Sequence, residues 1–336
     1  MFWRSSLAGP LLLLQLTGCS GDPSPVPAGL SSELRLVPPS ESIPAIIRTH
    51  PAGTELATLS VTGRPFGLAL SRDGLVYCTL LDAASLARTS LQAAPPSTLS
   101  VDRVPTDVAF TPTGSWAWVT NQHAGTIGLV DTRRHQQVAT VPVEGDPFRV
   151  VAGPEGQAVY ATTNAGNLVR IDAETRTVSW TNHLGGNLNG LAIDPSGARV
   201  YVGDVTGKLY EVSSAGEVLR TLPLPGQPQG LALSSDAKEL YVAGEAGDLI
   251  FLDLERGVEL SRIALGAGAF GISVTPDQAQ IWVTAPQTGE LLVIDRVSRV
   301  ILKRISLGGM PRRLAFDVSG TTAVVADEAG SIRFLR

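Results

Sequence analysis

The sequence predicts an all-β fold, a seven-bladed β-propeller of four-stranded blades, on three observations. A short motif of alternating small and apolar residues occurs seven times, beginning at Gly67, Asp107, Arg149, Gly190, Gly230, Gly271 and Arg313. The intervals between these positions are 40, 42, 41, 40, 41 and 42 residues. Each copy holds short apolar segments separated by turn residues. A regular period near 40 residues built of strands is typical of propeller blades.

Four strands are expected in each copy. The innermost strand carries the motif, as in residues 230–233, and its apolar character on both faces indicates burial on both sides. A glycine-containing turn leads to a second strand that holds an aromatic residue, as in residues 117–120. A polar loop leads to a third strand, such as 249–253, and a fourth strand follows, for example at 137–141 or 299–302.

The last copy has room for only three strands, which end with residues 331–335. Residues 54–61 have the pattern of a strand but precede the first copy. We expect this N-terminal strand to lie beside the C-terminal strand, because that pairing completes the seventh blade and closes the ring with few open edges. Its side chains Leu56, Leu59 and Val61 are then expected to be buried.

The N-terminal segment has the layout of an export signal over residues 1–18. Arg4 precedes an apolar stretch from Leu7 to Leu16, which is shorter than the ~20 residues that a membrane-spanning helix needs. The sequence Leu-Thr-Gly-Cys that ends at Cys19 resembles the lipobox of bacterial lipoproteins. That resemblance implies lipidation at Cys19 and a membrane anchor, and Ser20 favours the outer membrane or cell surface. An ordinary secretory signal with a chance cysteine is the alternative.

Composition bounds the rest of the chain. Residues 19–44 are rich in Pro, Ser and Gly and are expected to form a tether, whereas 45–336 form the propeller, with the role of residues 45–49 left open. The formal net charge of −5 argues against nucleic-acid binding. If Cys19 is lipidated, Cys78 is the remaining thiol. We expect Cys78 to be a small buried side chain. We also expect the protein to be a monomer.

Several of these features resemble a known repeat family. The second-strand sequence Trp-Val-Thr-Asn at residues 118–121, the Ser-Arg-Asp-Gly turn at 71–74 and a proline two residues before five of the motifs resemble the Tyr-Val-Thr-Asn (YVTN) propeller repeats. That family includes bacterial surface proteins, lactonase-like propellers and relatives of dehydrogenase subunits. Because the matching residues are scaffold, the resemblance implies the fold and leaves the activity open.

Arginines provide the clearest candidate site. Closure of the ring is expected to bring Arg64 close to Arg312 and Arg313, while Arg149 and Arg313 replace the small residue that usually begins the motif. An arginine group at a concave mouth binds a carboxylate or phosphate bidentately, and Asn189 lies on the same set of loops. The alternative is that these arginines are solvated or pair with Asp107 and Asp146.

Metal and cofactor sites have little support in the sequence. It has four histidines, no clustered metal-binding motif and no Gly-x-Ser-x-Gly element, so no metal, cofactor or catalytic residue is predicted. The family resemblance suggests a lactonase-like metal site as an alternative. Such a site would draw its ligands from Asp107, Asp146, Asn189 and Asp204.

The leading hypothesis is an exported, envelope-anchored scaffold or binding module. It would recognise an envelope protein or a small ligand on its loop face without catalysing a reaction. The alternatives are a lactonase-like hydrolase and an accessory subunit of a periplasmic redox enzyme. An exposed apolar patch including Phe66, Phe148 and Phe270 would favour a protein partner, and converging acidic and amide side chains would favour the lactonase.

Overall fold

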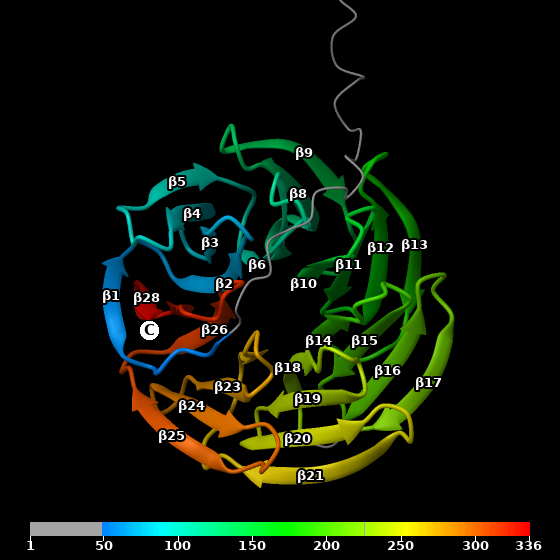
Figure 1. Cartoon of the computed structure of the whole chain (residues 1–336). Helices are drawn as coiled ribbons and strands as arrows, with labels where there is room; N and C mark the ends of the chain where they lie inside the picture. Colours follow the sequence, from blue (N-terminus) through cyan, green and yellow to red (C-terminus); the bar gives the residue numbers. More distant parts are fainter. Residues whose placement is uncertain (1–48, 225) are drawn as a thin grey trace, which may run out of the picture. The chain divides into compact units, whose positions relative to one another are not determined.

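A ring of seven four-stranded antiparallel sheets surrounds one axis in the computed structural model, which describes residues 49–224 and 226–336 (Figure 1). This confirms the predicted seven-bladed propeller. Among these residues the helical content is one short 3₁₀ turn, η1 (Gln122–Ala124). The expected signal segment, Cys19 and the tether lie outside the described residues.

Each blade runs from an innermost strand outward. The innermost strands are β2 (Pro65–Leu70), β6 (Pro105–Phe110), β10 (Pro147–Ala152), β14 (Leu188–Ile193), β18 (Pro228–Leu233), β22 (Ile272–Val274) and β26 (Pro311–Phe316). The second strands are β3 (Leu75–Leu80), β7 (Trp116–Asn121), β11 (Ala158–Thr163), β15 (Arg199–Asp204), β19 (Glu239–Gly244), β23 (Gln280–Ala285) and β27 (Ala323–Asp327). The third strands are β4 (Ser85–Ser90), β8 (Thr126–Asp131), β12 (Asn167–Asp172), β16 (Lys208–Ser213), β20 (Asp248–Asp253), β24 (Glu290–Asp295) and β28 (Ser331–Leu335). The outermost strands are β5 (Ser97–Ser100), β9 (Gln136–Pro142), β13 (Thr177–His183), β17 (Val218–Pro223), β21 (Val258–Ala264), β25 (Ile301–Ser306) and β1 (Glu55–Ser60).

The ring closes as predicted, because β1 pairs antiparallel with β28 and completes the seventh sheet (Figure 1). Thr54 and Arg336 exchange two backbone hydrogen bonds of 2.7 Å at the end of this pair. The predicted burial of Leu56 is wrong, since 53% of its surface is exposed. A register shift between Glu55 and Ala57 turns Leu56 outward, and Ala57, Leu59 and Val61 pack on the core instead.

The residues just before β1 also contact the ring. The backbone N–H of Thr49 donates to Ser319 at 2.8 Å, and His50 lies 2.6 Å from Asp277. The Lys303 ammonium donates to the carbonyl of Ala52 at 3.1 Å. Thr49 and His50 therefore join the chain to the turns of the seventh and sixth blades, respectively, while residues 45–48 lie outside the described part.

One expected strand begins later than predicted. The outermost strand placed at 299–302 starts at Ile301, because Arg299 has a φ of 59° and belongs to the turn after β24. The backbone N–H and hydroxyl of Ser298 both donate to the Asp295 carboxylate at 2.7 Å, which fixes that turn. These hydrogen bonds lower the pKa of Asp295.

Threonines in the second strands connect neighbouring blades. The backbone N–H of Gly67 donates to the Thr79 hydroxyl, and that of Gly271 donates to the Thr284 hydroxyl, each at 2.7 Å. The Thr284 hydroxyl in turn donates to the carbonyl of Arg312 in the following blade at 2.8 Å. These buried hydrogen bonds satisfy backbone groups where adjacent innermost strands meet.

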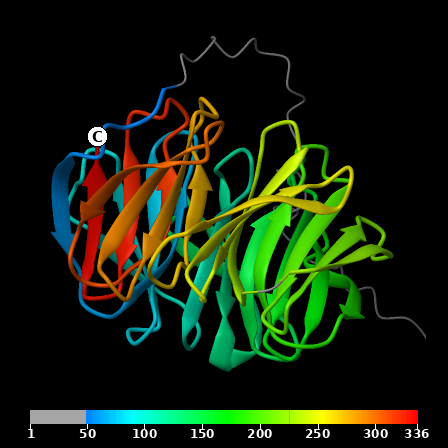
Figure 2. The ribbon, with the colours of Figure 1, turned by 90° about the horizontal axis from the view of Figure 1, so that it is seen from below.

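The ring has two distinct faces. We call the loop face the one that carries the loops leading into the innermost strands and the loops between second and third strands. The opposite turn face carries the turns between first and second strands and the C-terminus, which lies at the top in Figure 2. Thr49 contacts Ser319 on the turn face.

The core contains Cys78 as expected, with no exposed surface. Burial raises the pKa of this thiol to about 12, so it is protonated at neutral pH. No helix within the described ranges has the length and apolar character needed to cross a membrane.

Two leucines of the closing strand provide a matched test of ring closure. Leu59→Asp places a carboxylate against the core and should lower the free energy of unfolding by about 1–3 kcal/mol, which lowers Tm by roughly 3–10 °C. Leu56→Asp changes an exposed position and should stay within about 0.5 kcal/mol of the wild type. Thermal unfolding followed by circular dichroism measures both. Equal losses in the two variants would contradict the observed strand face.

Candidate functional site

The innermost strands present two successive rings of side chains near the loop face. The residues that precede the motif form the first ring: Phe66, Thr106, Phe148, Asn189, Gln229, Phe270 and Arg312. The first residues of the motif form the second ring: Gly67, Asp107, Arg149, Gly190, Gly230, Gly271 and Arg313. The second ring therefore holds three charged residues among four glycines.

The glycines of the second ring are required by the close approach of neighbouring strands. A Cβ atom at Gly271 would lie 2.2 Å from the carbonyl oxygen of Arg312. A Cβ atom at Gly230 would lie 2.5 Å from the carbonyl oxygen of Phe270. Side chains are excluded at these two positions. The three positions of the same ring that carry charged side chains therefore differ from the glycine positions in their packing.

Two of the three charges pair with each other. A guanidinium nitrogen of Arg149 lies 3.2 Å from the Asp107 carboxylate. The same carboxylate oxygen accepts a hydrogen bond of 3.1 Å from the backbone N–H of Val150. Asp107 is therefore held from two directions by the neighbouring blade. This is the pairing that the sequence analysis left open as an alternative to ligand binding.

The third charge, Arg313, has no such partner. Its side chain is buried, with 5% of the residue exposed, and its Nε and Nη2 atoms have no hydrogen-bond partner within residues 49–224 and 226–336. Its guanidinium carbon lies 4.4 Å from the centroid of the Phe270 ring, a cation–π contact. Burial, and then the charge of Arg149, lower its pKa well below the usual value, although an arginine still keeps its proton at neutral pH.

Arg64 and Arg312 are brought together by ring closure, as the sequence predicted. Both donate to the carboxylate of Glu328, which lies between β27 and β28. Burial alone would raise the pKa of Glu328, but the hydrogen bonds from the two arginines lower it. Their charges are therefore opposed by Glu328, and Arg64 also lies 3.5 Å from Asp82. The sequence patterns did not identify Glu328.

Asn189 belongs to a separate polar chain. Its amide donates to the side chain of Gln229 at 2.9 Å, and Gln229 donates to the Glu245 carboxylate at 2.8 Å. Asn189 is absent from the residues that line the cavity beside Arg313. The structure thus brings Arg149 and Arg313 to one cavity, Arg64 and Arg312 to Glu328, and Asn189 to a third cluster.

Three phenylalanines of the first ring pack against one another rather than form an exposed patch. The Phe66 ring lies 5.4 Å from Phe270 and 6.1 Å from Phe148, both edge to face. Phe66 and Phe270 are 8% and 9% exposed, and Arg312 lies over both rings. The exposed patch that would have favoured a protein partner is therefore not formed by these residues.

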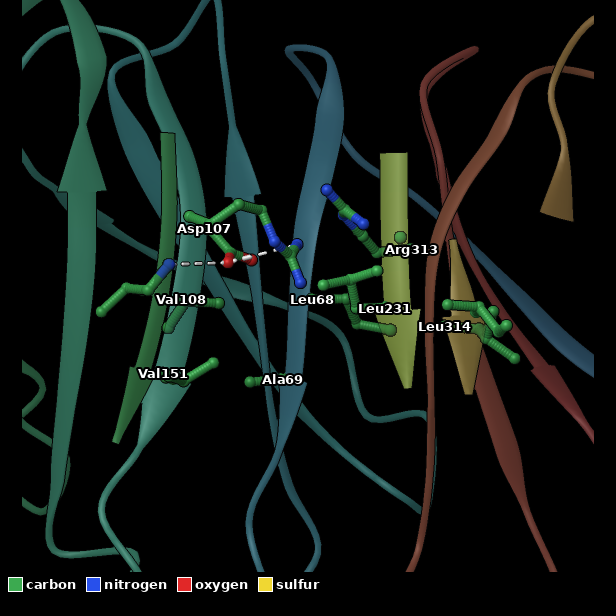
Figure 3. Close-up of a pocket in the computed structure, with 13 residues that line it drawn as sticks. Leu68, Ala69, Asp107, Val108, Val151, Leu231, Arg313 and Leu314 are labelled. Atoms are coloured by element: carbon green, nitrogen blue, oxygen red, sulfur yellow. Dashed lines mark hydrogen bonds and ion pairs between the residues drawn. The ribbon is translucent and has the colours of Figure 1, made fainter. Parts of the chain in front are cut away.

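A cavity of about 240 Å³ lies along the central channel beside Arg313. Figure 3 shows Asp107 and Arg313 at one end of it, Leu68, Leu231 and Leu314 next, and Ala69 and Val151 beyond them. The cavity is thus charged at one end and aliphatic along the rest. The sequence signal that identifies it is the replacement of the small residue by arginine in two of seven motifs.

Three of the four residues nominated for a lactonase-like metal site, Asp107, Asn189 and Asp204, have other partners. Asp107 pairs with Arg149, and the Asp204 carboxylate accepts the backbone N–H groups of Asn187 and Thr206. Across the described part of the chain, no three side chains of His, Cys, Asp or Glu are placed to hold a metal ion.

Comparison with known proteins supports the fold more than the function. No protein-family model matches the chain. Two curated proteins, each described as "Uncharacterized protein YncE", from Salmonella typhi and Salmonella typhimurium strain LT2, are 24% identical over 171 residues, which is 48% of this chain and 48% of each relative. The chain therefore spans about half the length of the curated relatives that it matches. The resemblance to YVTN repeats stays a prediction.

A solved structure extends the likeness to most of the ring. A chain of Kuenenia stuttgartiensis Hydrazine Synthase superposes with a TM-score of 0.75 at 15% identity, covering 86% of this chain and 99% of that chain. At this identity the similarity shows the propeller fold alone.

The two buried arginines should respond in opposite ways to replacement by an apolar side chain. Arg313→Met removes an unpaired buried charge and should raise the free energy of unfolding of the ligand-free protein by about 1–2 kcal/mol. Arg149→Met leaves Asp107 buried without its partner and should lower it by about 3 kcal/mol. Denaturant unfolding measures both. A destabilised Arg313→Met protein would mean that the guanidinium has a protein partner in solution.

Proposed function

We propose that this chain is a non-catalytic binding module of the bacterial cell envelope that takes a small anion in its central channel. The observation that carries the proposal is the buried Arg313 guanidinium, whose Nε and Nη2 atoms have no partner in the described structure. Leaving a buried charge uncompensated is costly, so a bound anion would remove a penalty as well as make charge-assisted hydrogen bonds.

Binding is favoured over catalysis by the composition of the cavity. Its charged lining residues are Arg149, Arg313 and Asp107, and one oxygen of the Asp107 carboxylate, Oδ2, is contacted by both Arg149 and the Val150 N–H. Two guanidinium groups can hold an anion, whereas catalysis in this cavity would depend on Asp107 as base or nucleophile, a group that is held in an ion pair. The remaining lining residues are aliphatic or glycine.

A small ligand is favoured over a protein partner by the packing above the cavity. Phe66, Phe148 and Phe270 contact one another instead of forming an apolar patch exposed to solvent. Arg64 and Arg312, which lie nearer the rim, are opposed by Glu328. The free binding capacity therefore lies inside the channel.

The anchoring part of the proposal rests on the sequence. The lipobox-like residues that end at Cys19 and the tether at 19–44 would hold the propeller at the envelope. Thr49, the first described residue, contacts Ser319 on the turn face, so the chain joins the ring on the face opposite to the loops.

Anion binding should appear as a shift in thermal stability. At constant ionic strength, a carboxylate or sulfate at a hundred times its Kd should stabilise the wild type by about 2.7 kcal/mol, a rise in Tm of roughly 5–10 °C. Arg313→Met should lose this shift. Arg64→Gln should keep it, since Arg64 is engaged by Glu328. Equal shifts in the wild type and Arg313→Met, or no shift with any anion, would overturn the proposal.

Anchoring has a separate test. Growth with a fatty-acid analogue should label the wild type and not Cys19→Ala, which should accumulate as precursor or leave the membrane fraction. Cys78→Ala controls for labelling of the other cysteine, which is fully buried. Equal labelling of the wild type and Cys19→Ala would contradict lipidation at Cys19.

A further inference from the structure

We propose that the ligand of the central channel is a small aliphatic monocarboxylate. Its carboxylate would lie on the Nε and Nη2 edge of Arg313, and its hydrocarbon group would lie along Leu68, Leu231 and Leu314. This inference rests on the proposed function and specifies its ligand class. Four properties of the cavity support it: the geometry of the free donors, the net charge, the aliphatic wall and the volume.

The free donors of Arg313 match a carboxylate. Nε and Nη2 lie on the same edge of the guanidinium plane and point in parallel directions. Both atoms lack a hydrogen-bond partner in the part of the chain that the structure describes and are buried, so a carboxylate reaches them only when the side chains that cover them move aside. A carboxylate presents two oxygens with the spacing of this edge and accepts two parallel hydrogen bonds.

The net charge of the cavity matches a ligand that carries one negative charge. Arg149 and Arg313 contribute two positive charges and Asp107 one negative charge, so the charged end carries a net charge of +1. A monocarboxylate neutralises this charge. A phosphate dianion would leave an excess negative charge and further oxygens facing apolar side chains, which is unfavourable in a buried site.

The walls next to the charged end are aliphatic. Leu68, Leu231 and Leu314 are 7–8% exposed, and Ile272 and Val108 line the same space. Figure 3 shows the three leucines on the side of Arg313 that leads to Ala69 and Val151. Bare inorganic anions would leave this surface without contacts, whereas an alkyl group would cover it.

The volume limits the length of the alkyl group. A dry apolar cavity of ~150 Å³ accommodates benzene. The volume of about 240 Å³ here therefore fits a carboxylate with an alkyl group of about four to six carbons. Longer chains would need space beyond the alanine positions.

A chain-length series tests the inference directly. Isothermal titration of the full chain with acetate, butyrate, hexanoate, octanoate and decanoate should show a three- to fourfold tighter Kd for each added methylene until the cavity is full. Hexanamide, which has the same chain without the charge, should bind at least a hundredfold more weakly than hexanoate, because the charge-assisted bonds are lost. Sulfate serves as the inorganic anion for comparison.

Three variants separate the contribution of the carboxylate from that of the alkyl group. Arg313→Met should abolish hexanoate binding. Arg313→Lys keeps the charge but loses the parallel donors, so it should still bind hexanoate, with a weaker Kd than the wild type. Leu231→Ala enlarges the aliphatic part and should move the best chain length upward by one or two carbons. Melting curves of each variant confirm that it is folded.

The outcomes distinguish the two levels of the proposal. Chain-length dependence that disappears in Arg313→Met supports the monocarboxylate. Binding of sulfate through Arg313 with no gain from added methylenes overturns the ligand class while leaving an anion-binding module. Absence of binding by every carboxylate and by sulfate in the folded wild type overturns both.

Discussion

The close approach of seven innermost strands around one axis is the constraint on which the rest of this structure depends. Where those strands come nearest, a Cβ atom would overlap the neighbouring backbone, as at Gly271 and Gly230. Hydrogen bonds from buried threonines such as Thr284 then join one blade to the next at the same level. Because this layer has little free space, any side chain placed in it must point along the channel or between blades.

Arg313 gains its significance from that constraint. It occupies a position where four of the other six blades have glycine, is almost completely buried and lies against Phe270, yet two of its nitrogens have no partner in the described residues. The neighbouring charges are paired instead. Arg149 pairs with Asp107 in the same ring, and nearer the rim Arg64 and Arg312 share Glu328. We infer a small anionic ligand because the positive charge of Arg313 has no hydrogen-bonded partner in the described residues and lies beside an aliphatic cavity.

The sequence could predict what repeats, and it could not predict what breaks the repeat. The seven motifs and the unpaired strand at 54–61 were sufficient for the blades and for ring closure. Leu56 lies on the exposed side of its strand because the register shifts between Glu55 and Ala57. A sequence pattern of alternating buried and exposed residues does not reveal such a shift. Glu328 acquires its full role only when ring closure brings the distant Arg64 to a carboxylate that Arg312 contacts within the same blade. The substitution pattern identified Arg149 and Arg313 as unusual, but which of them pairs with Asp107 depends on side-chain placement between blades.

The most direct measurement of the central claim is a crystal structure of the wild type grown with bromide, with data collected at the bromine absorption edge. We expect an anomalous peak in the central channel, in contact with the Nε and Nη2 edge of Arg313. Bromide found only at the exposed rim, with the Arg313 guanidinium hydrogen-bonded to a protein acceptor, would contradict it.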